Sequence, residues 1–155
     1  MARARFKVLW LVLAYVAYVA SGHAGLAHAT AHPASTTIWA PTGIAVATTL
    51  LCGPSALVMV FLASLTLNAL TLGAGWATLV ISLGNTAEAA VAAALVRRFA
   101  GGAMSFTSGR NAFQYCLLAG FVAPVIAALV GALAATTATH EAFSLPRVFG
   151  VWWIT

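Results

Sequence analysis

The sequence predicts an all-α protein, a polytopic bundle of transmembrane helices with five full spans and the start of a sixth. Hydrophobic residues make up 63% of the 155 residues and charged residues only 6%, whereas a soluble domain carries about 25% charged residues. The apolar runs approach the roughly 20 residues that a helical span needs. They are hydrophobic on every side, whereas the strands of a membrane barrel would alternate apolar and polar residues.

The first apolar run covers residues 8–27 and follows a basic start. We expect it to form the first span. A cleavable signal peptide is the alternative, because the Ala-His-Ala at residues 27–29 has the pattern of a cleavage site. Residues 28–37 contain Pro33 and a Ser/Thr run, so they are predicted to form a loop.

The next three spans are predicted over residues 38–53, 54–73 and 76–98. The second and third are joined by a tight Gly-Pro-Ser turn at residues 53–55. Only the two residues 74–75 link the third span to the fourth. We therefore expect the third and fourth spans to be antiparallel neighbours.

The remaining chain predicts one more full span. A Gly/Ser-rich loop over residues 99–110 precedes the fifth span, residues 111–136, in which Pro124 predicts a kink. Another loop, residues 137–147, leads to residues 148–155, which are too few to cross a bilayer. We therefore expect the whole chain to be one transmembrane region, the N-terminal part of a longer protein, without an output domain of its own.

The basic residues predict the orientation of the chain in the membrane. With the N-terminus in the cytoplasm, six of the seven lie on the cytoplasmic side: Arg3, Arg5, Lys7, Arg97, Arg98 and Arg110. Only Arg147 lies outside, and this bias follows the positive-inside rule. The basic residues form no patch interleaved with aromatic residues, so we expect the lipid bilayer as a partner and no nucleic acid.

Glu88 is one of only two acidic residues in the chain. It lies about 18 Å into the fourth span, where a carboxylate costs at least about 2.5 kcal/mol. We therefore expect it to face other helices, together with Asn85 one turn away. The small residues Gly84, Ala89 and Ala93 flank this face and allow close helix contact. Two interpretations stay open: a polar node that binds a ligand or relays a proton, or a hydrogen-bonded node that fixes helix packing.

Asn68 in the third span is a candidate partner for these polar residues. Its height in the bundle differs from that of Glu88 by roughly 11 Å, which argues against direct contact. We expect Asn68 to pair nearer the external end, toward Thr78 or Ser82.

The segment WAPTG, residues 39–43, begins the second span. Trp39 fits the interfacial belt of aromatic residues, and Pro41 fits the first turn of a helix. Gly43 allows another helix to come close. An anchored helix start explains all three residues, and a re-entrant or ligand-lining segment at the external face is the alternative.

No residue pattern indicates catalysis, and we predict no metal and no cofactor. His23, His28 and His32 cluster near the end of the first span, but no Cys, Asp or Glu lies near them. Cys52 and Cys116 lie inside apolar runs and are predicted to be buried small hydrophobes. A nucleophile with its base, a phosphate loop and a metalloprotease motif are all missing, so we do not expect an enzyme.

Two segments, IWAPTGIAVATTLL (38–51) and LGNTAEAAVAAALVRRF (83–99), resemble the first membrane-associated sensor (MASE) domain family. Members of that family carry a Trp-Pro-Pro-(Ser/Thr/Ala)-Gly-Ile-Ala start of the second span. Their fourth span carries a Gly-Asn-(Thr)-x-Glu-(Ala) pattern and ends in Leu-x-Arg-Arg. The matching positions are Trp39, Pro41, Thr42, Gly43, Ile44, Ala45, Gly84, Asn85, Thr86, Glu88, Ala89, Arg97 and Arg98.

The resemblance implies an integral-membrane sensory domain in the inner membrane of a bacterium, preceding an output domain such as a histidine kinase of a two-component system or a diguanylate cyclase. It would detect a small ligand or a membrane protein partner, and a homodimer is a further candidate assembly. The ligand-binding or signalling candidates are Glu88, Asn85, Trp39, Pro41 and Gly43, while Arg97 and Arg98 mark the topology. A small transporter or channel subunit, with Glu88 as an ion or proton site, is the alternative function.

Overall fold

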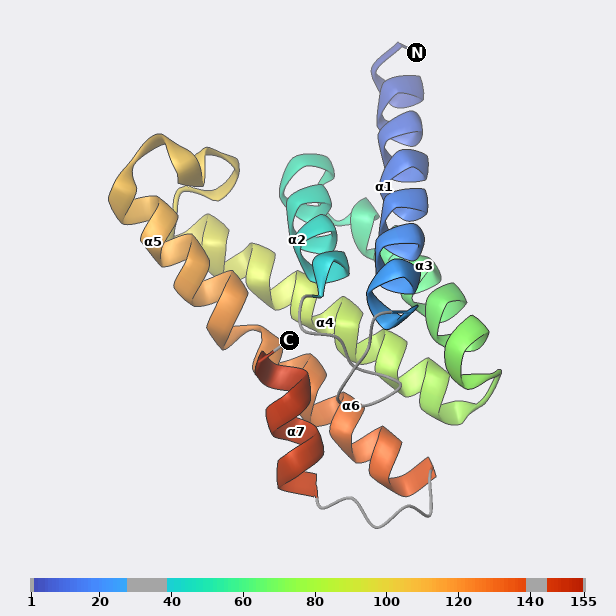
Figure 1. Cartoon of the computed structure of the whole chain (residues 1–155). Helices are drawn as coiled ribbons and strands as arrows, with labels where there is room; N and C mark the ends of the chain where they lie inside the picture. Colours follow the sequence, from blue (N-terminus) through green and yellow to red (C-terminus); the bar gives the residue numbers. More distant parts are fainter. Residues whose placement is uncertain (1, 28–38, 139–144, 155) are drawn as a thin grey trace.

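The structure, a computed structural model, describes residues 2–27, 39–138 and 145–154. Within these ranges every regular element is a helix, which confirms the all-α fold class (Figure 1). The elements are α1 (Ala2–Ala27), α2 (Ala40–Cys52), α3 (Ser55–Leu72), α4 (Trp76–Phe99), the 3₁₀-helix η1 (Gly102–Thr107), α5 (Gly109–Leu117), the π-helix η2 (Leu118–Val122), α6 (Pro124–Ala138) and α7 (Leu145–Ile154).

Four helical segments of the described chain are long and apolar enough to cross a membrane. They are Arg5–Ala27, Ser55–Leu72, Trp76–Phe99 and Gly109–Ala134. The helix α2 has only 13 residues, which gives a length of about 20 Å against a hydrocarbon core of about 30 Å. The predicted count of five full spans is therefore not confirmed: the structure has four candidate spans and one shorter apolar helix.

The tight turn between α2 and α3 is confirmed. Gly53 adopts a left-handed φ of 75°, and its N–H donates a hydrogen bond to the carbonyl oxygen of Thr49. Glycine reaches this backbone conformation without a steric cost. Because the turn ends α2 at Cys52 and α3 begins at Ser55, it also limits the length of α2.

The predicted kink at Pro124 is confirmed as well. Pro124 cannot donate a backbone hydrogen bond, and the π-helix η2 directly precedes it. The N–H of Ala123 donates to the carbonyl oxygen of Leu118, five residues back, at 3.0 Å. Figure 1 shows the chain bending here between α5 and α6.

Two of the predicted loops, residues 99–110 and 137–147, are partly helical in the structure. The Gly/Ser-rich segment 99–110 contains η1 and the start of α5 rather than loop alone. Residues 28–37 lie outside the described residues, as do residues 139–144 of the last loop. The final helix α7 begins at Leu145 and packs along α6.

The bundle packs around α4, which contacts α2, α3 and α6. As expected from their two-residue link, α3 and α4 are neighbours. Small residues bring α4 and α6 together, because a Cβ atom added at Gly84 would lie 2.9 Å from Cγ1 of Val130. Gly22 does the same for α1 and α3, since a Cβ atom there would lie 2.2 Å from Cδ2 of Leu67.

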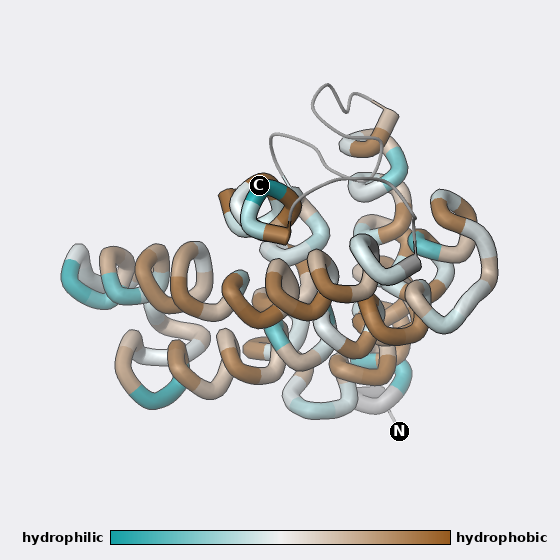
Figure 2. The backbone as a smooth tube through the Cα atoms, turned by 90° about the horizontal axis from the view of Figure 1, so that it is seen from below, coloured by the Kyte–Doolittle hydropathy of each residue, from teal (hydrophilic) through white to brown (hydrophobic). Residues whose placement is uncertain are grey.

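The outer surface of the bundle is apolar. Hydrophobic residues run along most of each helix, and hydrophilic residues gather mainly near helix ends and turns (Figure 2). The exposed side chains include Leu51, Val58, Leu70, Phe106 and Phe113. A surface of this kind suits contact with lipid tails.

Candidate functional site: a cavity inside the bundle

Glu88 lies in the interior of the bundle, as predicted. It is twelve residues from Trp76 at one end of α4 and eleven from Phe99 at the other, so it is about 18 Å and about 16 Å from the two ends. Its side chain is only 4% exposed. The carboxyl oxygen Oε1 is buried and has no hydrogen-bond partner among the described residues.

Ser64 of α3 joins Asn68 and Asn85 in a buried hydrogen-bond network. The Nδ2 atom of Asn85 donates to Oγ of Ser64 at 2.8 Å. The Nδ2 atom of Asn68 donates to the carbonyl oxygen of Ser64 at 2.8 Å and to its Oγ at 3.1 Å. The network ties α3 to α4 at mid-height.

The predicted pairing of Asn68 is wrong. Its hydrogen bonds run to Ser64 in its own helix rather than toward Thr78 or Ser82. Those two hydroxyl groups donate instead to backbone carbonyl oxygens near them in sequence, Gly73 and Thr78. In helices, Ser and Thr often satisfy their hydroxyl group on a carbonyl one turn back.

Two further residues complete the polar surroundings of Glu88. The hydroxyl group of Tyr18, which is 1% exposed, lies beside Ser64, Asn85 and Glu88. The side chain of Thr42 lies beside the Glu88 carboxyl group. Sequence analysis missed Tyr18, although a phenol in the middle of a span is itself a signal that a polar partner lies inside the bundle.

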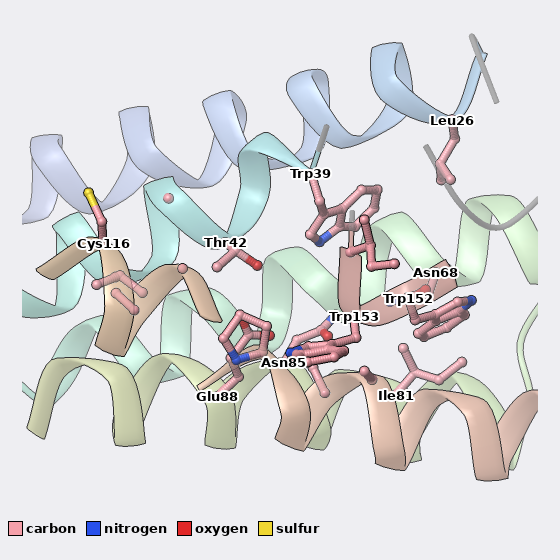
Figure 3. A pocket seen from close by; sticks show the side chains of 18 of the residues that line it. Leu26, Trp39, Thr42, Asn68, Ile81, Asn85, Glu88, Cys116, Trp152 and Trp153 are labelled. Carbon is pink, nitrogen blue, oxygen red and sulfur yellow. The ribbon is translucent and has the colours of Figure 1, made fainter. Parts of the chain in front are cut away.

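A cavity of about 370 Å³ opens beside Glu88 and Asn85. Its walls come from every α-helix of the bundle, including the last residues of α1 and α7. Figure 3 shows Trp39, which directly precedes α2, and Thr42 of α2 on one side of the cavity, and Glu88 and Asn85 of α4 on the other. The volume falls in the range of small-molecule sites, about 300–1,000 Å³.

The segment WAPTG contributes in part to this cavity. Trp39 and Gly43 line it, as Thr42 does, and a Cβ atom added at Gly43 would meet no atom within 4 Å. Pro41 is buried and does not line the cavity; its ring lies 3.2 Å from the position of a Cβ atom on Gly22. Four of the five candidate residues therefore border one space, and Pro41 packs against α1.

The C-terminal tryptophans border the same cavity, which sequence analysis did not foresee. The indole Nε1 of Trp153 donates to the carbonyl oxygen of Phe121, within the π-helix η2, at 2.9 Å. Trp152 packs against Gly131, where a Cβ atom would lie 1.9 Å from its ring. Its Nε1 is buried and has no hydrogen-bond partner among the described residues. In the sequence, two adjacent Trp near an aromatic-rich helix end resemble an interfacial anchor. The sequence therefore does not indicate that they line a cavity.

The basic residues at the end of α4 hold positions outside the cavity. The guanidinium group of Arg97 donates to the carbonyl oxygen of Thr49, near the C-terminus of α2. Arg98 is exposed, and its guanidinium carbon lies 5.7 Å from the ring centroid of Phe99. Both side chains are at a bundle end, where membrane proteins place such groups.

The remaining titratable residues form no second site in the described chain. Among residues 2–27, 39–138 and 145–154, no group of three His, Cys, Asp or Glu side chains could hold a metal ion. His23 is exposed on α1, while His28 and His32 lie outside the described residues. Both cysteines are free, but Cys52 is half-buried and Cys116 is exposed, so their predicted burial is wrong.

Fold and cavity together define an integral-membrane helix bundle with a largely apolar interior cavity that holds a few polar side chains, a multi-pass membrane protein. The MASE1 family model matches residues 8–155, and the chain belongs to this family of membrane-associated sensory domains. MASE1 is a sensory rather than a catalytic domain, in agreement with the function that the resemblance implied. No curated protein and no solved structure matches the chain.

Proposed function

We propose that the chain is the ligand-sensing input region of a bacterial signal-transduction protein, in the inner membrane and with its N-terminus in the cytoplasm. The output domain would be a histidine kinase or a diguanylate cyclase. The observation that carries the proposal is the cavity of about 370 Å³ lined by Glu88, whose buried Oε1 has no hydrogen-bond partner among the described residues. Buried polar atoms are nearly always hydrogen-bonded, and a bound ligand would supply the missing partner.

The cavity is suited to sensing because it lies between helices rather than within one. A ligand changes an equilibrium only when it binds one arrangement better than the other. A molecule that contacts Glu88 of α4, Thr42 of α2 and Trp152 of α7 would favour the packing that brings these helices together. The short helix α2 and the C-terminal helix α7 are the elements that we expect to shift.

The route to an output domain begins at α7 in this proposal. Trp153 bonds the backbone of Phe121 and packs on its ring, with centroids 4.6 Å apart. Phe121 belongs to η2, where the helix between α5 and α6 is broken. Breaks of this type are common at functional sites, so a ligand-dependent shift at η2 would pass directly to α7.

The test is Glu88→Gln in the full-length parent protein, read with a transcriptional or cyclic-dinucleotide reporter. We expect the protein to reach the membrane at normal levels, with an output that is locked on or off. Thr86→Val is the matched control, because Thr86 is in the same helix, does not line the cavity and bonds only the carbonyl oxygen of Ser82 among the bonds described. Unchanged output with Glu88→Gln would contradict the sensory role, and Glu88-dependent ion flux in proteoliposomes would favour the transporter subunit instead.

The orientation has its own test. In Figure 1 the N-terminal end of α1 and the connection from α4 to α5 lie toward the top, and the turn from α3 to α4 lies at the lower right. Arg97 and Arg98 are at the C-terminal end of α4. A fluorescent protein fused after Arg98 should therefore fluoresce, and a phosphatase fused there should be inactive. A strongly active phosphatase fusion would reverse the topology.

A further inference from the structure

We propose that the cavity binds a small organic monocation, a protonated amine attached to an apolar body that also carries a hydrogen-bond acceptor. This inference rests on the proposed function and names the class of ligand. Three features of the lining support it: its charge, its aromatic rings and its second unpaired polar atom.

Charge is the first feature. Glu88 is the one acidic residue that lines the cavity, and no Lys, Arg or His of the described chain lines it. The amide nitrogens of Asn68 and Asn85 donate to Ser64, and no donor of the described residues forms a hydrogen bond with Glu88 Oε1. An ammonium group has three N–H donors, and it would give the buried carboxylate both a hydrogen bond and a counter-charge.

Aromatic rings are the second feature. Trp39, Trp152, Trp153 and Tyr115 line the cavity. The faces of Trp and Tyr rings attract cations, and aromatic cages of this kind recognise organic ammonium groups. The same rings offer flat apolar surface to the body of the ligand, which disfavours a small hydrated metal ion as the occupant.

The third feature is the indole N–H of Trp152, a buried donor without a partner among the described residues. Trp152 lines the same cavity as Glu88, and the two side chains belong to α7 and α4. An acceptor on the ligand, such as a hydroxyl or carbonyl oxygen, would satisfy it. The ligand would then be held at one end by Glu88 and at the other by Trp152, with α4 and α7 joined through it.

The experiment measures binding to the full chain in lipid nanodiscs by isothermal titration calorimetry, with empty nanodiscs subtracted. Three ammonium compounds are each compared with the neutral alcohol of the same skeleton: butylamine with 1-butanol, tryptamine with tryptophol, and 2-(4-methoxyphenyl)ethylamine, whose ether oxygen is a hydrogen-bond acceptor, with 2-(4-methoxyphenyl)ethanol. We expect saturable binding of at least one amine, about tenfold or more tighter than its alcohol. 3-Phenylpropanoate, an anion of similar size, should not bind.

Two variants assign the preference to the cavity. Glu88→Gln should weaken amine binding by about tenfold or more and leave alcohol binding within about threefold. Trp153→Leu should weaken it by roughly three- to tenfold, whereas Trp76→Leu should not, because Trp76 is exposed and lies outside the lining. If Glu88→Gln does not fold, Gly43→Leu is the second variant: Gly43 lines the cavity and an added Cβ meets no atom within 4 Å, so we expect the larger side chain to take up cavity space and abolish binding. Gly150→Leu is its control, since both glycines have no atom within 4 Å of an added Cβ and only Gly43 lines the cavity.

Three outcomes would overturn the inference: alcohols that bind as tightly as amines, amine binding that is insensitive to both Glu88→Gln and Gly43→Leu, and no saturable amine binding at all. The first outcome leaves the proposed sensory function intact and replaces the cation with a neutral donor. The reporter assay with Glu88→Gln in the full-length parent decides the sensory function independently of these probes. Failure of the two proposals is therefore distinguishable.

Discussion

The buried polar groups of this bundle fall into two sets that differ in hydrogen bonding. Around Ser64, the amide nitrogens of Asn68 and Asn85 both have oxygen partners. By contrast, Glu88 Oε1 and Trp152 Nε1 are buried and have no hydrogen-bond partner among the described residues. Buried polar atoms without partners are rare in folded proteins, and here both belong to residues that line the cavity.

The difference separates two interpretations that the sequence could not tell apart. Glu88 and Asn85 lie one turn apart on one face, so each could have fixed helix packing or bound a ligand. In the structure Asn85 is paired with α3, whereas Oε1 of Glu88 has no partner among the described residues. We interpret the Ser64 network as the part that holds the helices and the Glu88 side as the part that a ligand completes.

Ser64→Ala should give the largest effect on stability. It removes the oxygen that accepts from Asn85 and leaves that amide without its partner, which costs about 2 kcal/mol of unfolding free energy. The measurement is reversible unfolding in a bilayer mimetic, for example by steric trapping. Ser55→Ala is the control, because Ser55 is exposed and bonds only its neighbouring turn, and it should stay within about 0.5 kcal/mol. Equal changes of the unfolding free energy in the two variants would contradict a structural role of the network.

Glu88→Gln should change the unfolding free energy by no more than about 1 kcal/mol, although it is as deeply buried as Ser64. The reason is that Oε1 has no hydrogen bond to lose, while a neutral amide is less costly than a carboxylate at this depth. The same unfolding assay measures it, beside the reporter output. A loss of stability as large as that of Ser64→Ala would place Glu88 in the structural set.

Most of the fold could be predicted from hydropathy, and the number of full spans could not. The fourth span was expected over residues 76–98 and is observed as Trp76–Phe99, because its apolar run and its terminal arginines mark both ends. The second apolar run, residues 38–53, is as hydrophobic as its neighbours. Its helix is nevertheless only 13 residues long, because Gly53 turns the chain at one end, and hydropathy does not report where a helix stops.

Of the residues at the site, Glu88 and Asn85 could be predicted from the sequence, whereas Ser64 and Trp152 could not. Glu88 and Asn85 are distinctive because each interrupts a run of small apolar residues. Ser64 is not distinctive, since a serine hydroxyl in a helix usually bonds its own backbone, and only packing decides whether it also accepts from another helix. The same holds for Trp152, whose contact with α6 depends on a glycine, Gly131, that is close in space but distant in sequence.

The two adjacent tryptophans of α7 allow a paired indole N–H to be compared with an unpaired one in the same helix. Trp153→Phe removes an indole N–H that donates to Phe121, and should lower the unfolding free energy by about 1 kcal/mol. Trp152→Phe removes an indole N–H that has no hydrogen-bond partner in the described part of the chain. Both variants lose a similar amount of ring, so each serves as the control for the other in the unfolding assay. Without a ligand, we therefore expect Trp152→Phe to lower the unfolding free energy less than Trp153→Phe does. We expect Trp152→Phe to weaken the binding of an amine that carries an acceptor more than Trp153→Phe does. Equal effects on stability would show that ring packing on α6 and η2, rather than hydrogen bonding, sets the position of α7.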